Sequence, residues 1–60
     1  MNIKKLREAR GWSQVDLAFR ARLSPDTIAK AETGKRVPSL NTIQRIAKVL
    51  NMTMAEVIES

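Results

Sequence analysis

The side chains best suited to contacting another molecule lie on one short segment, SPDTIAKAETG, at residues 24–34. At helical periodicity this segment buries little, because only Ile28 among its middle residues is large and apolar. The face opposite Ile28 carries polar side chains: Asp26, Thr27, Lys30 and Thr33. Short or hydrogen-bonding groups of this kind can meet the edges of bases in the major groove of DNA. A solvated polar face is the other interpretation of this segment alone.

Asp26 has the most specific chemistry in this set. A carboxylate only accepts hydrogen bonds and is repelled by phosphate, so it favours the exocyclic amine of cytosine or, less strongly, of adenine. Asp26 also stands in the first turn of the expected helix, where the helix dipole favours a negative charge. Two roles therefore stay open for Asp26: selection of a base, or stabilisation of the helix end alone.

The chain is basic, with eleven Lys and Arg against six Asp and Glu and a net charge of +5. All of its cations lie within residues 1–52, whereas residues 53–60 carry only acids among their charged side chains. A basic body suits a polyanion such as nucleic acid, and the acidic end does not. Small basic domains are also soluble because of their charge, so composition alone does not decide between these explanations.

The composition argues against catalysis and against a bound metal. The chain has no Cys, His or Tyr, so it has neither a thiolate ligand nor a histidine base, and its acids are scattered along the sequence. No glycine-rich phosphate loop appears either. We therefore expect no enzyme activity, no cofactor and no metal. No apolar run approaches the roughly 18 residues of a membrane span, so no membrane partner is expected and a cytosolic, or cytoplasmic, location is the default.

Five short helices are expected, because capping residues precede each run of helical periodicity. Their ranges are 3–10, 14–21, 25–33, 40–50 and 54–58. No segment alternates as a strand would. Only Arg22 and Leu23 separate the second range from the third, which is too short a link for a comfortable antiparallel pair, so a sharp crossing is expected there. A chain of 60 residues has room for one domain.

Three stretches of the chain carry a resemblance to a known family: LREARGWSQVDLA, LSPDTIAKAETGKRVPSL and IAKVLNMTMAEVI. In this order and spacing, from Leu6 to Ile58, the sequence resembles the Xre/Cro-type helix-turn-helix family, to which phage repressors belong. The resemblance implies an all-α, compact five-helix DNA-binding domain over residues 1–60, with the helix-turn-helix at about residues 14–33. It also implies that the second helix lies across the DNA backbone and the third enters the major groove.

The resemblance assigns roles to individual positions. Base contacts are expected from Pro25, Asp26, Thr27 and Lys30. Phosphate contacts are expected from Gln14, Arg22, Ser24, Lys35, Arg36 and Ser39. A structural salt bridge is expected between Arg7 and Glu32, and the pattern supports it independently, since both residues border the apolar stripes of their helices. Pro25 can offer only apolar contact, for example to a thymine methyl group.

Four positions depart from the family pattern. Pro25 stands where many relatives have a polar base reader, Ala31 stands where a larger apolar residue is usual, and Arg22 and Phe19 are the other two. Arg22 occupies a turn position where Gly is common, so it has either to accept a positive φ or to form a different turn. Phe19 stands where a polar residue is more usual, and it can lie at the edge of the core or in an exposed contact patch. We favour the edge of the core for Phe19.

The sequence therefore predicts a transcriptional regulator that binds an operator in double-stranded DNA, a repressor or self-regulating controller rather than an activator. A homodimer is expected through the C-terminal part, although some of these side chains can instead close the core: Met52, Met54, Val57 and Ile58. The alternative is a protein-interaction module, such as an antitoxin or coactivator domain that uses the same fold. A toxin or another protein partner cannot be identified from these residues.

Overall fold

The computed structural model describes residues 1–34 and 37–60, and its regular elements are five α-helices. They are α1 (Ile3–Glu8), α2 (Gln14–Ala21), α3 (Pro25–Thr33), α4 (Leu40–Leu50) and α5 (Met54–Glu59). No strand occurs in the described ranges, so the expected all-α, five-helix fold is confirmed. None of the helices in these ranges is long and apolar enough to cross a membrane.

Side-chain caps explain where the helices begin. Ser13 accepts a hydrogen bond from the Asp16 amide, and the Asp16 carboxylate accepts one from the Ser13 amide, at 3.0 and 2.8 Å. This reciprocal capping box satisfies two backbone amides that the start of α2 would otherwise leave unpaired. Thr53 and Glu56 form the same box at α5. Asn2, Ser24 and Ser39 cap the other three helices.

α1 ends earlier than its apolar spacing indicated. Its last helical residue is Glu8, and the Arg10 and Gly11 amides donate to carbonyls three residues back, at 3.0 and 2.9 Å. Such bonds form a tighter turn than the α-helix does. Gly11 closes this turn with a φ of 71°, a value that glycine adopts without the steric cost of a side chain.

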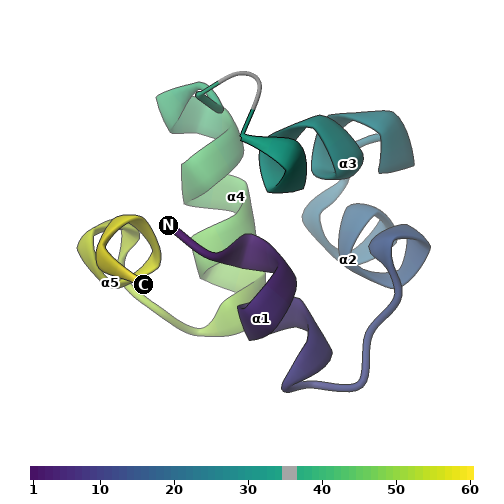
Figure 1. Ribbon diagram of the computed structural model, residues 1–60, viewed down its shortest axis with the longest axis horizontal. Helices are drawn as coiled ribbons and strands as arrows, with labels where there is room; N and C mark the ends of the chain where they lie inside the picture. The colour runs from purple at the N-terminus through teal and green to yellow at the C-terminus, as the bar shows by residue number, and fades with distance from the viewer. Residues whose placement is uncertain (35–36) are drawn as a thin grey trace.

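α4 runs through the middle of the molecule, with α5 on one side and α2 and α3 on the other (Figure 1). The core forms where the apolar stripes of the helices meet, and its large members are fully buried: Ile3, Leu17, Ile28, Ile46, Leu50 and Val57. The two ends of the chain meet beside α5, where the Asn2 amide donates to the Ser60 hydroxyl oxygen at 2.9 Å.

The link between α2 and α3 is a left-handed turn at Arg22, whose φ and ψ are 57° and 43°. The Leu23 amide donates to the Ala18 carbonyl at 2.8 Å. This is the hydrogen bond of a Schellman motif that spans the larger number of residues. Of the two outcomes left open for Arg22, the structure has the positive φ. α4 ends in the same way at Asn51, with a φ of 57°, but Asn tolerates this conformation better than Arg does.

The expectation that Phe19 lies at the edge of the core is wrong, since its side chain is 84% exposed. α2 turns Leu17, Ala18 and Ala21 into the core. At helical periodicity these three residues leave Phe19 on the outward face, with Val15 one turn before it. Val15 and Phe19 therefore form an exposed apolar pair on α2.

The C-terminal residues expected at a dimer interface divide into two groups. Val57 is fully buried in the core, so it is not available to a second chain and instead closes the core, which is the other outcome expected for these residues. Met52 and Met54 are partly buried against the core. Ile58 is 45% exposed. Helical periodicity explains the division, because adjacent residues of α5 point in different directions.

The strain at Arg22 is testable by substitution. Replacing Arg22 with Gly should stabilise the fold by about 1 kcal/mol, because a side chain in the left-handed region costs about that much. For a domain of this size the melting temperature should rise by about 4–8 °C per kcal/mol. Thermal unfolding followed by circular dichroism measures this shift. Arg22→Ala is the matched control, since it removes the same charge but keeps the strain, and equal melting temperatures for the two variants would refute the prediction.

Candidate nucleic-acid interface

A cleft lies between the outer face of α3 and the start of α4. Its lining residues are Asp26, Thr27, Lys30, Ala31, Val37, Pro38, Ser39 and Thr42. Four residues expected to contact DNA thus come together from two segments: Asp26, Thr27, Lys30 and Ser39. The cleft is open to solvent, and its α3 side carries the polar side chains of Asp26, Thr27 and Lys30, which can hydrogen-bond to base edges.

Two serines hold the helix starts on either side of this cleft. Ser24 accepts a hydrogen bond from the Thr27 amide at 3.2 Å, and its hydroxyl lies 2.8 Å from the Thr27 hydroxyl. Ser39 makes the same pair of contacts with Thr42, at 3.2 and 3.0 Å. Each serine fixes the first turn of its helix. A phosphate at either place would compete for these hydroxyl hydrogens.

Asp26 and Lys30 form an ion pair on the outer face of α3, with Nζ 3.0 Å from Oδ2. Both side chains are well exposed, at 73% and 63%. Exposed pairs of this kind contribute only about 0.2–1 kcal/mol, so the pair can open when a better partner arrives. Its i, i+4 spacing is visible in the sequence, although the sequence-based expectation gave Asp26 and Lys30 separate base contacts.

Four other residues expected at the interface do not line the cleft. Pro25 and Ser24 lie just before it, at the start of α3. Gln14 lies at the start of α2, and Arg22 at its opposite end. Two further expected phosphate contacts, Lys35 and Arg36, fall outside the described residues.

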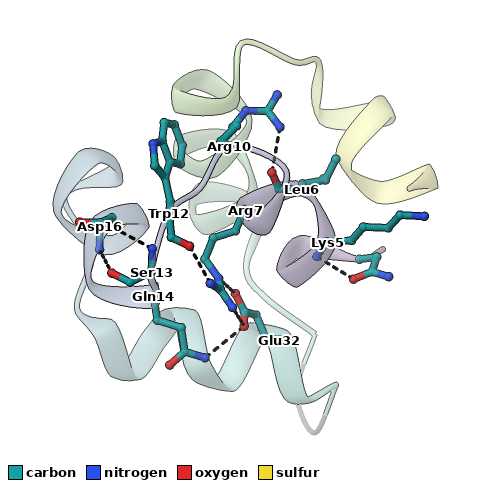
Figure 2. A network of polar contacts seen from close by, with 10 residues as sticks. Lys5, Leu6, Arg7, Arg10, Trp12, Ser13, Gln14, Asp16 and Glu32 are labelled. Carbon is teal, nitrogen blue, oxygen red and sulfur yellow. Dashed lines mark hydrogen bonds and ion pairs between the residues drawn. The ribbon is translucent and has the colours of Figure 1, made fainter.

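The expected pair of Arg7 and Glu32 joins α1 to α3 beneath the interface. Arg7 Nε lies 2.7 Å from Glu32 Oε2, and Arg7 Nη2 lies 3.1 Å from Oε1. Figure 2 shows the guanidinium group between this carboxylate and the Trp12 carbonyl oxygen, which accepts from Nη1 at 2.7 Å. The exposed fractions of the two side chains are only 9% and 5%. A buried pair with these forked hydrogen bonds fixes the relative position of its helices.

Gln14 adds a contact that the sequence analysis missed. Its amide nitrogen donates to Glu32 Oε1 at 3.1 Å (Figure 2), so the start of α2 is tied to the end of α3. An amide group has two N–H donors, and one of them is used here. The network therefore holds three elements in one arrangement: α1, the start of α2 and the end of α3.

The pKa values of Arg7 and Glu32, the two charged groups of this network, are both shifted. Burial raises the pKa of Glu32, but the hydrogen bonds from Arg7 and Gln14 and the Arg7 charge outweigh it, so the net pKa is lowered. The hydrogen bond to Glu32 raises the pKa of Arg7, against the opposing effect of burial. Both directions favour the charged pair.

Comparison with known proteins gives one match: the sequence model of the helix-turn-helix family matches residues 3–57. No curated protein and no solved structure matches the chain. The matched range includes α2, α3 and the turn at Arg22, and it also contains the network around Glu32.

Removing Arg7 should be costly, because it leaves Glu32 as an unpaired buried charge. We expect Arg7→Ala to lower the free energy of unfolding by about 3 kcal/mol, as measured by chemical denaturation. The double variant Arg7→Met with Glu32→Leu is the control, because replacing both charges with apolar groups can be nearly neutral. A single variant as stable as the natural chain would mean that the pair contributes nothing.

The lowered pKa of Glu32 predicts a loss of stability in acid. Its contribution is complete above the unfolded pKa of about 4.3 and is lost as the pH falls through the lower folded value. Caps also lower the pKa of Asp16 and Glu56, so these residues act in the same direction. Glu32→Gln should unfold more easily at neutral pH and show a shallower loss between about pH 5 and 3. Denaturation at several pH values measures both slopes, and parallel curves for the two proteins would contradict the prediction.

Proposed function

Since the chain belongs to the Xre/Cro-type helix-turn-helix family, a family of DNA-binding regulators, we propose that it is a cytoplasmic, sequence-specific repressor or self-regulating controller. The observation that carries this proposal is the cleft that brings Asp26, Thr27 and Lys30 together with Ser39. In the proposal, α3 enters the major groove of an operator and presents these three α3 side chains to base edges.

The proposed contacts follow from the chemistry of each position. Lys30 donates to an acceptor on a base edge, and Asp26 accepts from an exocyclic amine. Thr27 can do either through its hydroxyl group, and Pro25 offers an apolar surface to a thymine methyl group. The proposed phosphate contacts surround this set: Gln14, Arg22, Ser24, Lys35, Arg36 and Ser39. These contacts fix the position of α3 on the duplex, and the base contacts supply the specificity.

Repression is the simplest outcome of this mode of binding. A domain held on an operator excludes other proteins from the same stretch of DNA, and this effect needs no additional partner. Self-regulation follows when the operator lies at the gene that encodes the protein.

We further propose that the protein binds its operator as a homodimer. One α3 covers only a few base pairs, and two copies gain specificity from half-sites about 34 Å apart. Ile58 is the best candidate for the contact, because it is exposed at the C-terminal end. Met52 and Met54 are close to it in sequence and only partly buried, so they can add to the same contact. Sedimentation of the protein alone and with DNA tests this proposal, and a monomer in both cases rules it out.

A protein-interaction module is the second candidate function, and the exposed apolar pair on α2 favours it. Phe19 and Val15 are 84% and 61% exposed, one helical turn apart on the same face. Salt dependence separates the two functions. Binding to DNA weakens steeply with salt because phosphate contacts release counterions, whereas a mainly apolar protein contact shows no such slope.

Substitution of Asp26 tests the proposed contacts in the cleft. We expect Asp26→Asn to relax base preference at one position of each half-site and to strengthen binding to unrelated DNA, because a charge repelled by phosphate is lost. We expect Lys30→Ala to weaken binding more evenly across sequences. Random-site selection followed by footprinting measures the preference, the half-site spacing and the symmetry together.

Glu59→Gln is the matched control for Asp26→Asn, because it makes the same change of charge on α5, away from the cleft. It should leave the selected sequence unchanged. If Asp26→Asn also leaves the selected sequence unchanged, Asp26 has no part in base selection and only stabilises the start of α3.

A further inference from the structure

A second hollow lies between the end of α2 and the second half of α4. It is lined by Arg20, Ala21, Arg22, Arg45, Lys48 and Val49. Four of these six residues are cations and none is an acid. The hollow shares no lining residue with the cleft beside α3. Like charges held together repel one another, so this arrangement favours the arrival of an anion.

Two of the cations are held in place by neighbouring groups. Arg45 Nη1 donates to the Arg22 carbonyl oxygen at 3.2 Å, which links α4 to the turn after α2. The Arg20 guanidinium carbon lies 4.5 Å from the centre of the Trp12 ring, a stacked cation–π contact. Ordering a long side chain on binding costs entropy. That cost is smaller when the side chain is already held near its binding position.

Arg20 also interacts with an acid, Asp16, whose pKa is lowered mainly by its hydrogen bonds with Ser13 and further by the charge of Arg20. Its carboxylate, however, accepts the Ser13 amide at 2.8 Å as part of the helix cap. Asp16 therefore serves the start of α2, whereas the hollow lies at the other end of that helix.

Arg22 supplies an independent observation. Its backbone has a φ of 57°, a conformation that is unfavourable for an arginine and ordinary for a glycine. Strained residues of this kind occur often at functional sites, and an observed outlier is a sound starting point for a hypothesis of function. Arg22 itself lines the hollow, and its carbonyl oxygen accepts the hydrogen bond from Arg45.

We infer that this hollow is a second phosphate-binding surface, which contacts the DNA backbone beside the half-site that α3 occupies. The inference rests on the proposed function. α4 connects the two surfaces, because Thr42 lines the cleft and Arg45, one turn further along, lines the hollow. Side chains three residues apart on a helix are only about 5–6 Å from each other at Cβ. A duplex seated in the cleft therefore brings its sugar–phosphate strand within reach of Arg45, and Lys48 extends the cluster by one further turn of α4.

This surface changes affinity without changing base preference. Each phosphate neutralised contributes about −0.9 to the slope of log K against log salt concentration. Contacts to phosphate carry no direct sequence information. Arg45 and Lys48, which have no assigned role in the cleft, should therefore contribute to the slope alone.

The double variant Arg45→Gln with Lys48→Gln tests the inference, with binding to the selected operator measured by fluorescence anisotropy at several salt concentrations. The slope should become less negative by about 1–2, and the selected sequence should stay the same. The control is Lys4→Gln with Lys5→Gln, which removes the same charge from α1, a helix that lines neither surface. It should change the slope by less than half as much. Lys48→Gln alone keeps the hydrogen bond of Arg45 and should give about half the effect, which guards against a folding defect.

The outcomes separate this inference from the proposed function. If the natural chain binds DNA without a salt-dependent slope, the proposed function itself fails. If the natural chain shows the slope and the double variant keeps it, only the phosphate surface is overturned. Titration with inorganic pyrophosphate, followed by NMR, tests a free phosphorylated ligand. Saturation of the hollow by pyrophosphate together with an unchanged DNA slope would overturn the DNA assignment in favour of such a ligand.

Discussion

The buried pair of Arg7 and Glu32 is the interaction on which the rest of the structure depends. A chain of this size has a small apolar core and marginal stability, and α3 contributes only Ile28 as a fully buried side chain. The forked contact of 2.7 and 3.1 Å supplies the geometric constraint that the apolar core does not. α3 can therefore keep most of its surface free of the core and still have a defined position.

Because the Arg7–Glu32 contact fixes α3 in place, most of the surface of this helix does not have to be apolar. Its inner side needs one isoleucine and one glutamate to be anchored, and its outer side is left to polar groups that line the cleft. Gln14 extends the constraint to the start of α2. As a result, α2 and α3 are held together at two places. The start of α2 is bound to the end of α3 through Gln14 and Glu32, and the end of α2 is joined to the start of α3 by the turn at Arg22.

Much of this arrangement could be predicted from the sequence, because it depends on local chemistry. The caps at Ser13 and Ser24 follow from residue type and spacing. The pairing of Arg7 with Glu32 follows from the family resemblance and from the apolar stripes that both residues border. The positive φ at Arg22 was one of two outcomes that the sequence left open. The misses have a different origin. Phe19 was misplaced because its burial depends on which face α2 turns to the core, and the Gln14 contact depends on how two helices cross. Neither is a property of one segment. The ion pair of Asp26 and Lys30 could have been foreseen from its i, i+4 spacing.

That ion pair also bears on how quickly an operator could be found. A protein that searches along DNA is held by phosphates while it slides, and excess positive charge lengthens each stay at an unrelated site. With Asp26 beside Lys30, the outer face of α3 carries no net charge of its own, so it adds little to the time spent at the wrong sequence. In the proposed function, this face attracts DNA only where the bases offer partners for both groups at once, so the proposed base contacts would set the speed of search as well as selectivity.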